Sequence, residues 1–472
     1  VVFELELVKQ IEINIDYILI LVTKYHDSHC NDKETLITIQ KSIDASPELR
    51  SKKALIENFI DGINDVDDVM AEWHSYIAAE KEKQLNEIIA EEKLKERLSL
   101  FDKTIAGEST NRVPTLSNDF TWRLLDTDLG ILPSEALRDF PKFQKITYEF
   151  QERYNYDCYE MSGMRNNFRM SDAVGGTHDI DDKTGAIQAL DRTFMNDDEL
   201  EAFASEPVKL LWEKVAPRAF GEVTYGQLRE AIKASCDQYK AEDEITETFI
   251  RKYGVPASSR CGGFAPIEML FNQYRGIMGL SCDMRRHFDQ VKAVCEAEKA
   301  GYVQSYSSCF EKGHRGEAPI SVWDANTTML ASSIMSVKQF EIFYWDAYKA
   351  VLDSAVKNGC TVFQFTEASL MKFTDFFRDV PDGTLSILVE KDDIAEMKKL
   401  LPNVTFIGGM DVNYLGHSSA EECVEQAKKV IDTLYPNFIF STNKMMSFRG
   451  DATRENLLAV QNFVLGYNPN NN

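Results

Sequence analysis

The spacing of apolar side chains divides the chain near residue 95. Only Gly62 of the 24 glycines and only Pro47 of the 13 prolines precede residue 96, so this part lacks the residues that strands and turns need. Apolar side chains recur at helical spacing over residues 3–25, and residues 73–98 alternate Glu and Lys with apolar intervals, as in a long solvated helix. The pattern predicts an all-helical segment over residues 1–95.

After residue 100, short β-branched or aromatic runs alternate with longer amphipathic stretches. Such alternation predicts parallel βαβ units, and therefore a doubly wound sheet or a (β/α)₈ barrel. Ser419 followed by Glu422 predicts a capping box, and Asp451 or Thr453 can cap the last helix. The clearest predicted strands are 361–365, 385–389, 404–407 and 437–440, with helices over 392–401 and 419–434.

Composition narrows the classes of function. The 52 basic and 76 acidic side chains give a net charge of −24, which disfavours binding to a nucleic-acid backbone. The nine cysteines form no C-x-x-C pair, so we expect a reducing cytoplasm rather than a disulfide framework. Charged residues interrupt the apolar first 22 residues, so we expect no membrane span there.

Two resemblances cover most of the chain. The segments ERLSLFDKTIAGESTNRVP, FAPIEMLFNQYRGIMGLSCDMRRHFDQVKAV and GHSSAEECVEQAKKVIDTLYPNFIFSTNK lie in residues 96–467, which resemble the uroporphyrinogen decarboxylase family, including its cobamide-dependent methyltransferases. This resemblance implies a TIM barrel over residues 96–472 with its site at the carboxyl ends of the strands. VKQIEINIDYILILVTKYHDSHCNDKE and ASPELRSKKALIENFI resemble the C-terminal helical region of a type I restriction enzyme R subunit. Residues 1–95 would then serve subunit assembly, joined to the barrel by a fusion.

Polar residues that end apolar strands are the first candidates for a site. In a (β/α)₈ barrel the loops after the strands converge on one opening, where reactive side chains belong. Each of these residues taken alone is also an ordinary loop starter. The candidates are Ser117, Asn118, Glu367, Glu390, Lys391, Asp411, Asn443 and Lys444. The loop residues His314 and His417 can each reach the same opening.

The sequence departs from the decarboxylases of the family it resembles. Their R-Q-A-G-R loop, whose arginines hold substrate carboxylates, is replaced by TLSNDFTWRL, with only Arg123 nearby. No acid stands near Met164, where the decarboxylases place an Asp against the tetrapyrrole. The segment instead offers Arg165, Asn167 and Arg169, which suit a carboxylate, phosphate or amide ligand. Decarboxylation of uroporphyrinogen is therefore disfavoured.

The methyltransferases of the family hold zinc with a His-x-Cys pair and a further Cys. Here the corresponding positions read FQFTEAS and FSTNKMMS, which leaves Glu367 as a hard ligand. His178, with three nearby aspartates in GGTHDIDD, is a second metal candidate, although a solvated turn is the more common meaning of such a cluster. A standard thiol-activating zinc site is not expected.

The resemblance and these departures favour a cytoplasmic methyl-transfer enzyme with altered central ligands. Catalysis would rest on Glu367, Asp411 and Lys444. Zinc, a corrinoid carried by a partner protein, and a homodimer are compatible with this hypothesis. Decarboxylation of a tetrapyrrole or another carboxylate, a non-catalytic binding barrel, and a restriction-enzyme accessory stay open as alternatives. An anionic or methylated substrate would be bound by Asn118, Arg165, Asn167, Arg169 and Asn443.

Overall fold

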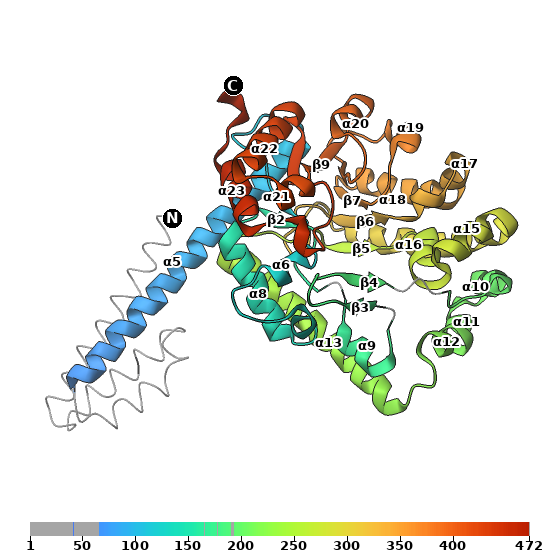
Figure 1. The fold of residues 1–472 in the computed structure, drawn as a ribbon, viewed down its shortest axis with the longest axis horizontal. Helices are drawn as coiled ribbons and strands as arrows, with labels where there is room; N and C mark the ends of the chain where they lie inside the picture. The colour runs from blue at the N-terminus through green and yellow to red at the C-terminus, as the bar shows by residue number, and fades with distance from the viewer. Residues whose placement is uncertain (1–40, 42–65, 165, 177, 190–192, 472) are drawn as a thin grey trace. The chain divides into compact units, whose positions relative to one another are not determined.

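The computed structural model describes residues 41, 66–164, 166–176, 178–189 and 193–471. Two compact units divide the chain, Val1–Ala90 and Glu91–Asn472 (Figure 1). The long helix predicted over residues 73–98 is confirmed as part of α5 (Val66–Ile105). The predicted helix over residues 3–25 lies outside the described residues.

Eight short parallel strands form the centre of the second unit. Six of them pair in the order β10-β9-β8-β7-β6-β5, and β1 pairs with β2. A parallel bridge between Thr115 and Phe440 places β1 beside β10, so that the full order runs β2-β1-β10-β9-β8-β7-β6-β5. Within the described part of the chain, no backbone pairing joins β2 to β5. The strands are β1 (Leu116–Ser117), β2 (Cys158–Tyr159), β5 (Cys261–Gly263), β6 (Ala325–Met329), β7 (Val362–Thr366), β8 (Leu385–Leu388), β9 (Thr405–Met410) and β10 (Phe438–Thr442).

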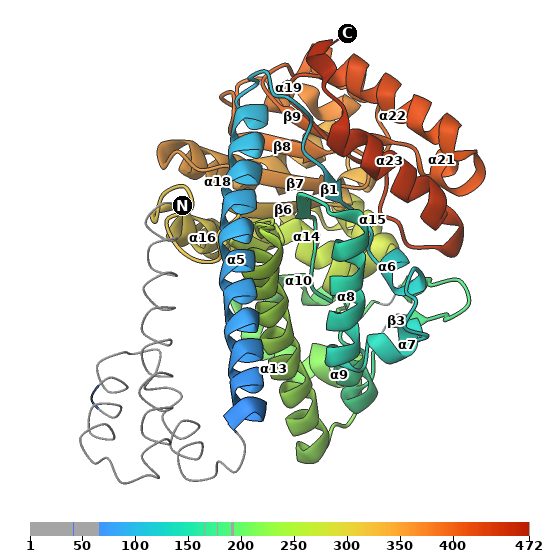
Figure 2. The same cartoon turned by 90° about the vertical axis from the view of Figure 1, so that its left-hand side faces the viewer.

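Helices follow the strands and cover their outer face (Figure 2). A separate antiparallel hairpin is formed by β3 (His178–Ile180) and β4 (Ile187–Ala189). The longer helices are α8 (Phe140–Tyr154), α13 (Tyr225–Thr248), α15 (Gly276–Arg286), α16 (Phe288–Phe310), α18 (Asp346–Lys357), α22 (Ala420–Leu434) and α23 (Arg454–Gly466). Short helices include α6 (Trp122–Leu125), α7 (Pro133–Ala136), α9 (Phe168–Val174), α10 (Leu200–Ser205), α14 (Pro266–Met269), α17 (Val337–Phe340), α20 (Ile394–Leu400) and α21 (Val412–His417).

Local sequence explains where these elements begin and end. The predicted capping box is confirmed at α22, where the Ser419 hydroxyl accepts from the Glu422 N–H and the Glu422 carboxylate accepts from the Ser419 N–H. Thr453, and not Asp451, caps α23. The four predicted strands are confirmed as β7 to β10. The resulting mixed α/β fold with a parallel sheet confirms the α/β part of the predicted fold class, and closure into a (β/α)₈ barrel stays a prediction.

Alternation along the strands separates two apolar cores. Side chains are directed to opposite faces at successive strand positions. On β7, Val362 belongs to the large cluster against the helices, whereas Phe363 and Phe365 belong to a second, smaller cluster. We call this second cluster the inner core: Phe101, Ile105, Leu116, Cys158, Val322, Trp323, Phe363, Phe365, Leu388, Ile407 and Ile439.

The carboxyl-terminal end of α5 is part of the inner core. The rings of Phe101 and Trp323 meet edge to face, with centroids 5.8 Å apart. Arg97 donates from Nε to the fully buried Asp157 at 3.1 Å, and Arg112 donates to the same carboxylate at 2.6 Å. Burial opposes ionisation of Asp157, but the guanidiniums of Arg112 and Arg97 outweigh it and lower its pKa. This end of α5 is therefore fixed to the strands by both packing and charge.

Candidate functional site

Polar residues follow the inner core at the carboxyl ends of the strands, a region we call the mouth. On β7, Phe365 belongs to the inner core, so alternation places Glu367, two residues further on, toward the same face. By the same alternation, the residue two positions after each of Leu116, Cys158 and Leu388 also lies toward this face. The residues placed in this way are Asn118, Glu160, Glu367 and Glu390, which we call the mouth residues.

Asn118 is a buried amide with no hydrogen-bond partner for its side chain. It is 2% exposed, and neither Nδ2 nor Oδ1 finds a partner among the described residues. Only its backbone is engaged, because its carbonyl accepts from the Met446 N–H at 2.9 Å. An unsatisfied buried polar group costs about 1–3 kcal/mol, so a position of this kind is typical of a ligand contact.

The charged residues that follow β1, Asp119 and Arg123, form an ion pair with each other. Asp119 Oδ2 lies 2.6 Å from Arg123 Nε, and Asp119 also accepts from the Ser117 hydroxyl at 2.6 Å. Arg123 donates from Nη1 to the Ser162 carbonyl at 3.0 Å and from Nη2 to the Met161 carbonyl at 2.5 Å. The single arginine near the position of the family's arginine loop is thus committed to an internal pair.

Three glutamates interact across the ends of β5, β7 and β8. Glu268 on α14 is fully buried and accepts from the N–H groups of Leu330 and Ala331, each at 3.0 Å. Burial raises the pKa of Glu268 to about 8 against these two bonds, and the charge of Glu367 adds to the rise. Burial and Glu367 also raise the pKa of Glu390. Glu367 therefore lies within electrostatic range of both other carboxyl groups.

Lys444 lies near Glu390, one of these three glutamates. Its Nζ lies 2.9 Å from Asp451 Oδ1, and the ammonium sits over the Phe448 ring at 5.4 Å. Asp451 is fixed in turn by the N–H groups of Ser447 and Phe448. The positive charge of Lys444 acts on Glu390 and favours its ionised form. Lys444 is held in place by these contacts.

Two of the predicted residues contribute to local structure. Asp411 accepts from the Asn413 N–H at 2.9 Å and so caps α21. Asn443 accepts from the Val412 N–H at 3.3 Å, and its own N–H donates to the Met410 carbonyl at 2.7 Å. Both residues fix the loops that follow β9 and β10. The structure gives Asp411 a capping role, and its predicted part in catalysis stays a prediction.

The predicted anion-binding segment holds one helix against another. Arg165 lies outside the described residues. Asn167 caps α9 by accepting from the Met170 N–H at 3.0 Å, and its amide donates to the Ala234 carbonyl on α13 at 2.9 Å. Arg169 pairs with Asp237 at 3.1 Å and lies over the Phe140 ring. Asn167 and Arg169 are therefore engaged with the protein itself.

The predicted metal candidates do not form a cluster of ligands. His178 is exposed on β3, and burial of part of its ring lowers its pKa. Of the described residues, the one group close enough to share an ion is Asp197, Asp283 and His287. Asp283 already accepts two bonds from Arg275, which neutralises much of its charge.

The donor set at the mouth does not fit a thiol-activating zinc ion. Such a site needs thiolate or imidazole ligands, whereas the mouth residues supply carboxylates and one amide. Cys360 lies before the first residue of β7, at the opposite end of that strand, with its thiol directed at the Phe310 carbonyl. Zinc therefore has no part in the reaction proposed below.

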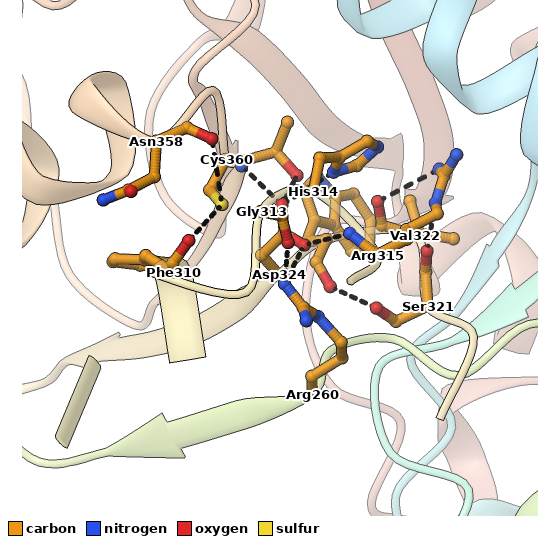
Figure 3. Close-up of polar contacts among 12 residues, drawn as sticks. Arg260, Phe310, Gly313, His314, Arg315, Ser321, Val322, Asp324, Asn358 and Cys360 are labelled. Atoms are coloured by element: carbon orange, nitrogen blue, oxygen red, sulfur yellow. Dashed lines mark hydrogen bonds and ion pairs between the residues drawn. The ribbon is translucent and has the colours of Figure 1, made fainter. Parts of the chain in front are cut away.

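A second polar cluster lies at the amino ends of β6 and β7 (Figure 3). Asp324 accepts from Arg260 at 2.5 Å and from the backbone of Arg315 at 2.9 Å, and it bonds His314 Nδ1 at 2.7 Å. Bonds to Asp102 and Asp324 raise the pKa of His314 to about 9. The expectation that His314 reaches the mouth is wrong, because its loop precedes β6 and closes the opposite end.

Sequence reasoning did not single out Glu268. The residue lies in the short helix after β5, within the apolar run FAPIEML. A single acid inside such a run is the signal that could have identified it, because a buried carboxyl group needs a specific partner. Its contacts with the turn after β6 come from a distant part of the sequence.

Comparison with known proteins extends these findings. Residues 1–116 match the family model described as the subunit R C terminal of the type I restriction and modification enzyme. This match confirms the predicted resemblance of residues 1–95 and continues to Leu116, so it includes the end of α5 in the inner core. No curated protein matches the chain.

A large part of the chain has a counterpart among solved structures. A methyltransferase from Methanosarcina mazei is 14% identical, with a TM-score of 0.51, and the similarity covers 79% of this chain and 98% of that chain. The two share a fold. At this identity the likeness carries no further information on residues or substrates. Separately, none of the described helices is long and apolar enough to cross a membrane.

Proposed function

We propose that residues 91–472 form a TIM-barrel enzyme of the uroporphyrinogen decarboxylase type, with methyl transfer as its reaction. The strand order and the inner core, to which six of the eight strands contribute, support a barrel. One observation supports the site above all. Polar residues follow the inner core at the mouth, and the side chain of one of them, the buried Asn118, has no hydrogen-bond partner among the described residues. Such a group is prepared for a ligand.

Methyl transfer is favoured over decarboxylation for two reasons. One solved structure that shares the fold is a methyltransferase. Among the described residues, the one arginine near the position of the family's arginine loop, Arg123, is paired with Asp119 and is not available to the carboxylates of a tetrapyrrole. In this proposal Glu367 and Glu390 bind and orient the substrate, and the positive charges of Lys391 and Lys444 favour the ionised form of Glu390. A corrinoid carried by a partner protein would supply the methyl carrier.

Replacing Glu367 with Gln tests the site. The full chain is assayed with cob(I)alamin and a panel of methylated donors, following formation of methylcobalamin by absorbance. The wild type should turn over at least one donor, and Glu367→Gln should abolish turnover without lowering the melting temperature. Glu425→Gln, on the exposed face of α22, is the matched control. Unchanged turnover in Glu367→Gln would remove this residue from the site, and a wild type inactive on every donor would favour a binding barrel.

A second function follows from the family match of residues 1–116. We propose that this segment contributes to assembly with subunits of a type I restriction system. The test is co-purification of the full chain with the modification and specificity subunits of such a system. A fragment of residues 91–472 that binds them equally well would contradict an assembly role for the first 90 residues.

A further inference from the structure

The charges of the mouth favour a positively charged substrate over the anionic one expected from the sequence. Glu367 and Glu390 each follow by two residues Phe365 and Leu388, which pair in register on β7 and β8, and Glu268 lies within the electrostatic range of Glu367. Of the nearby cations, Lys391 and Lys444 both act on the carboxyl group of Glu390, and Lys444 also pairs with Asp451. An anion entering this region would meet carboxylates first, whereas a cation would relieve the repulsion between them.

The arginines expected to hold an anion are engaged elsewhere. Arg123 is fixed by Asp119 and two backbone carbonyls. Arg169 pairs with Asp237 at 3.1 Å and lies over an aromatic ring, which ties α9 to α13. Either arginine would have to break an existing ion pair to bind a substrate. The described part of the mouth therefore offers an anion little compensation for its lost hydration.

Asn118 provides an independent sign of a ligand and limits its chemistry. Its amide presents an N–H donor and a carbonyl acceptor, both buried and both without a partner among the described residues. A bare metal ion could bind Oδ1 only and would leave Nδ2 unsatisfied. Among the described residues, the glutamates of the mouth also do not form a trio of carboxylates close enough to share one ion. An organic molecule with its own polar group satisfies Asn118 better.

We propose that the mouth binds an organic ammonium ion, with a neighbouring carbonyl or hydroxyl group that pairs with Asn118. Glu367 and Glu390 neutralise the ammonium, and the apolar side chains of Phe365 and Leu388 below them accommodate its methyl groups. This inference rests on the proposed function, because a methylated ammonium would be the methyl donor. The sequence predicted an anionic substrate, whereas this inference assigns a cationic one.

Isothermal titration of the full chain tests the charge of the ligand directly. The probes are choline, its uncharged isostere 3,3-dimethyl-1-butanol, and propionate, all in buffer that contains a metal chelator. Choline should bind at least about tenfold more tightly than the isostere, because the two differ only in the charged nitrogen. Glu367→Gln and Glu390→Gln should each weaken choline binding by about fivefold or more.

Further variants separate a bound cation from a structural effect. Asn118→Leu should weaken choline, whose hydroxyl can pair with the amide, more than tetramethylammonium, which has no hydroxyl. Glu425→Gln should change neither. Each variant is checked for folding by circular dichroism, and Glu390→Gln provides a second test if Glu367→Gln unfolds.

Several outcomes would overturn the inference. They are equal affinity for choline and its isostere, tighter binding of propionate, no binding of any ammonium probe at about 10 mM, and binding of Mg²⁺ or Zn²⁺ that needs the same glutamates while choline fails. Ammonium binding without methyl transfer would uphold this inference and contradict the proposed reaction. Methyl transfer from a neutral or anionic donor, with no ammonium affinity, would uphold the proposed reaction and contradict this inference.

Discussion

Replacing Glu268 with Gln should change how the stability of the protein depends on pH. Glu268 is fully buried, and its carboxyl group accepts from the N–H groups of Leu330 and Ala331. Burial raises its pKa from 4.5 to about 8, and the charge of Glu367 acts in the same direction. Gln has the shape of the protonated acid but does not titrate.

The size and sign of the effect follow from linkage. A carboxyl group with a raised pKa in the folded state binds its proton more tightly there than in the unfolded chain. Its contribution to stability is complete below the unfolded pKa of 4.5 and is lost as the pH rises toward about 8. At about 1.4 kcal/mol per pH unit, the interval from 4.5 to about 8 corresponds to a loss of up to about 5 kcal/mol.

Urea unfolding of the wild type and Glu268→Gln at several pH values measures this loss. The free energy of unfolding of the variant, minus that of the wild type, should rise as the pH rises through this interval and then level off. Glu425→Gln should show no such trend, because its side chain is exposed on α22. A difference that stays constant with pH, or that falls as the pH rises, would refute a raised pKa of Glu268 in the folded protein.

Three further predictions concern the junction between the two matched segments. The fragment 91–472 should fold with a melting temperature close to that of the full chain. The fragment 117–472 should not fold, because it lacks the end of α5. Equal melting curves of the two fragments in a thermal scan would contradict this prediction. Phe101→Ala should lower the free energy of unfolding by about 3–5 kcal/mol in urea, and a loss below about 1 kcal/mol would show that the ring is not a core contact. Asp157→Asn leaves Arg97 and Arg112 without their anion and should lower the free energy of unfolding by about 3–5 kcal/mol. In a double-mutant cycle, the same change made in the Arg97→Met background should lower it by less, if the ion pair with Arg97 is the cause.

The fold could be predicted from the sequence where local patterns decide it. The strands β7 to β10 coincide with short apolar runs, and the capping box at Ser419 begins α22 as expected. The pairing of the amino-terminal part could not be predicted in this way. Arg97 and Asp157 are separated by 60 residues, and neither position carries a local signal for the other.

The site could be predicted only in part, for a related reason. The strand-end rule selects Asn118 and Glu367, which alternation places on the interior face. It also selects Asp411, because a short acid after a strand is equally the preferred cap of the next helix. The partner of Arg169, Asp237, lies on a distant helix, so the sequence could not show that this arginine is engaged.

The unpaired edges of β2 and β5 have a consequence for the motions of the wall. β5 spans only Cys261–Gly263, and the two glycines in it are exposed. Backbone amides that lack a strand partner exchange their hydrogens with water through small local openings, at a fraction of the free energy of global unfolding. Amides of β5 that face this seam should therefore exchange long before those of β7 and β8, which are paired on both sides. Deuterium labelling would then identify this seam as the part of the sheet that opens most readily.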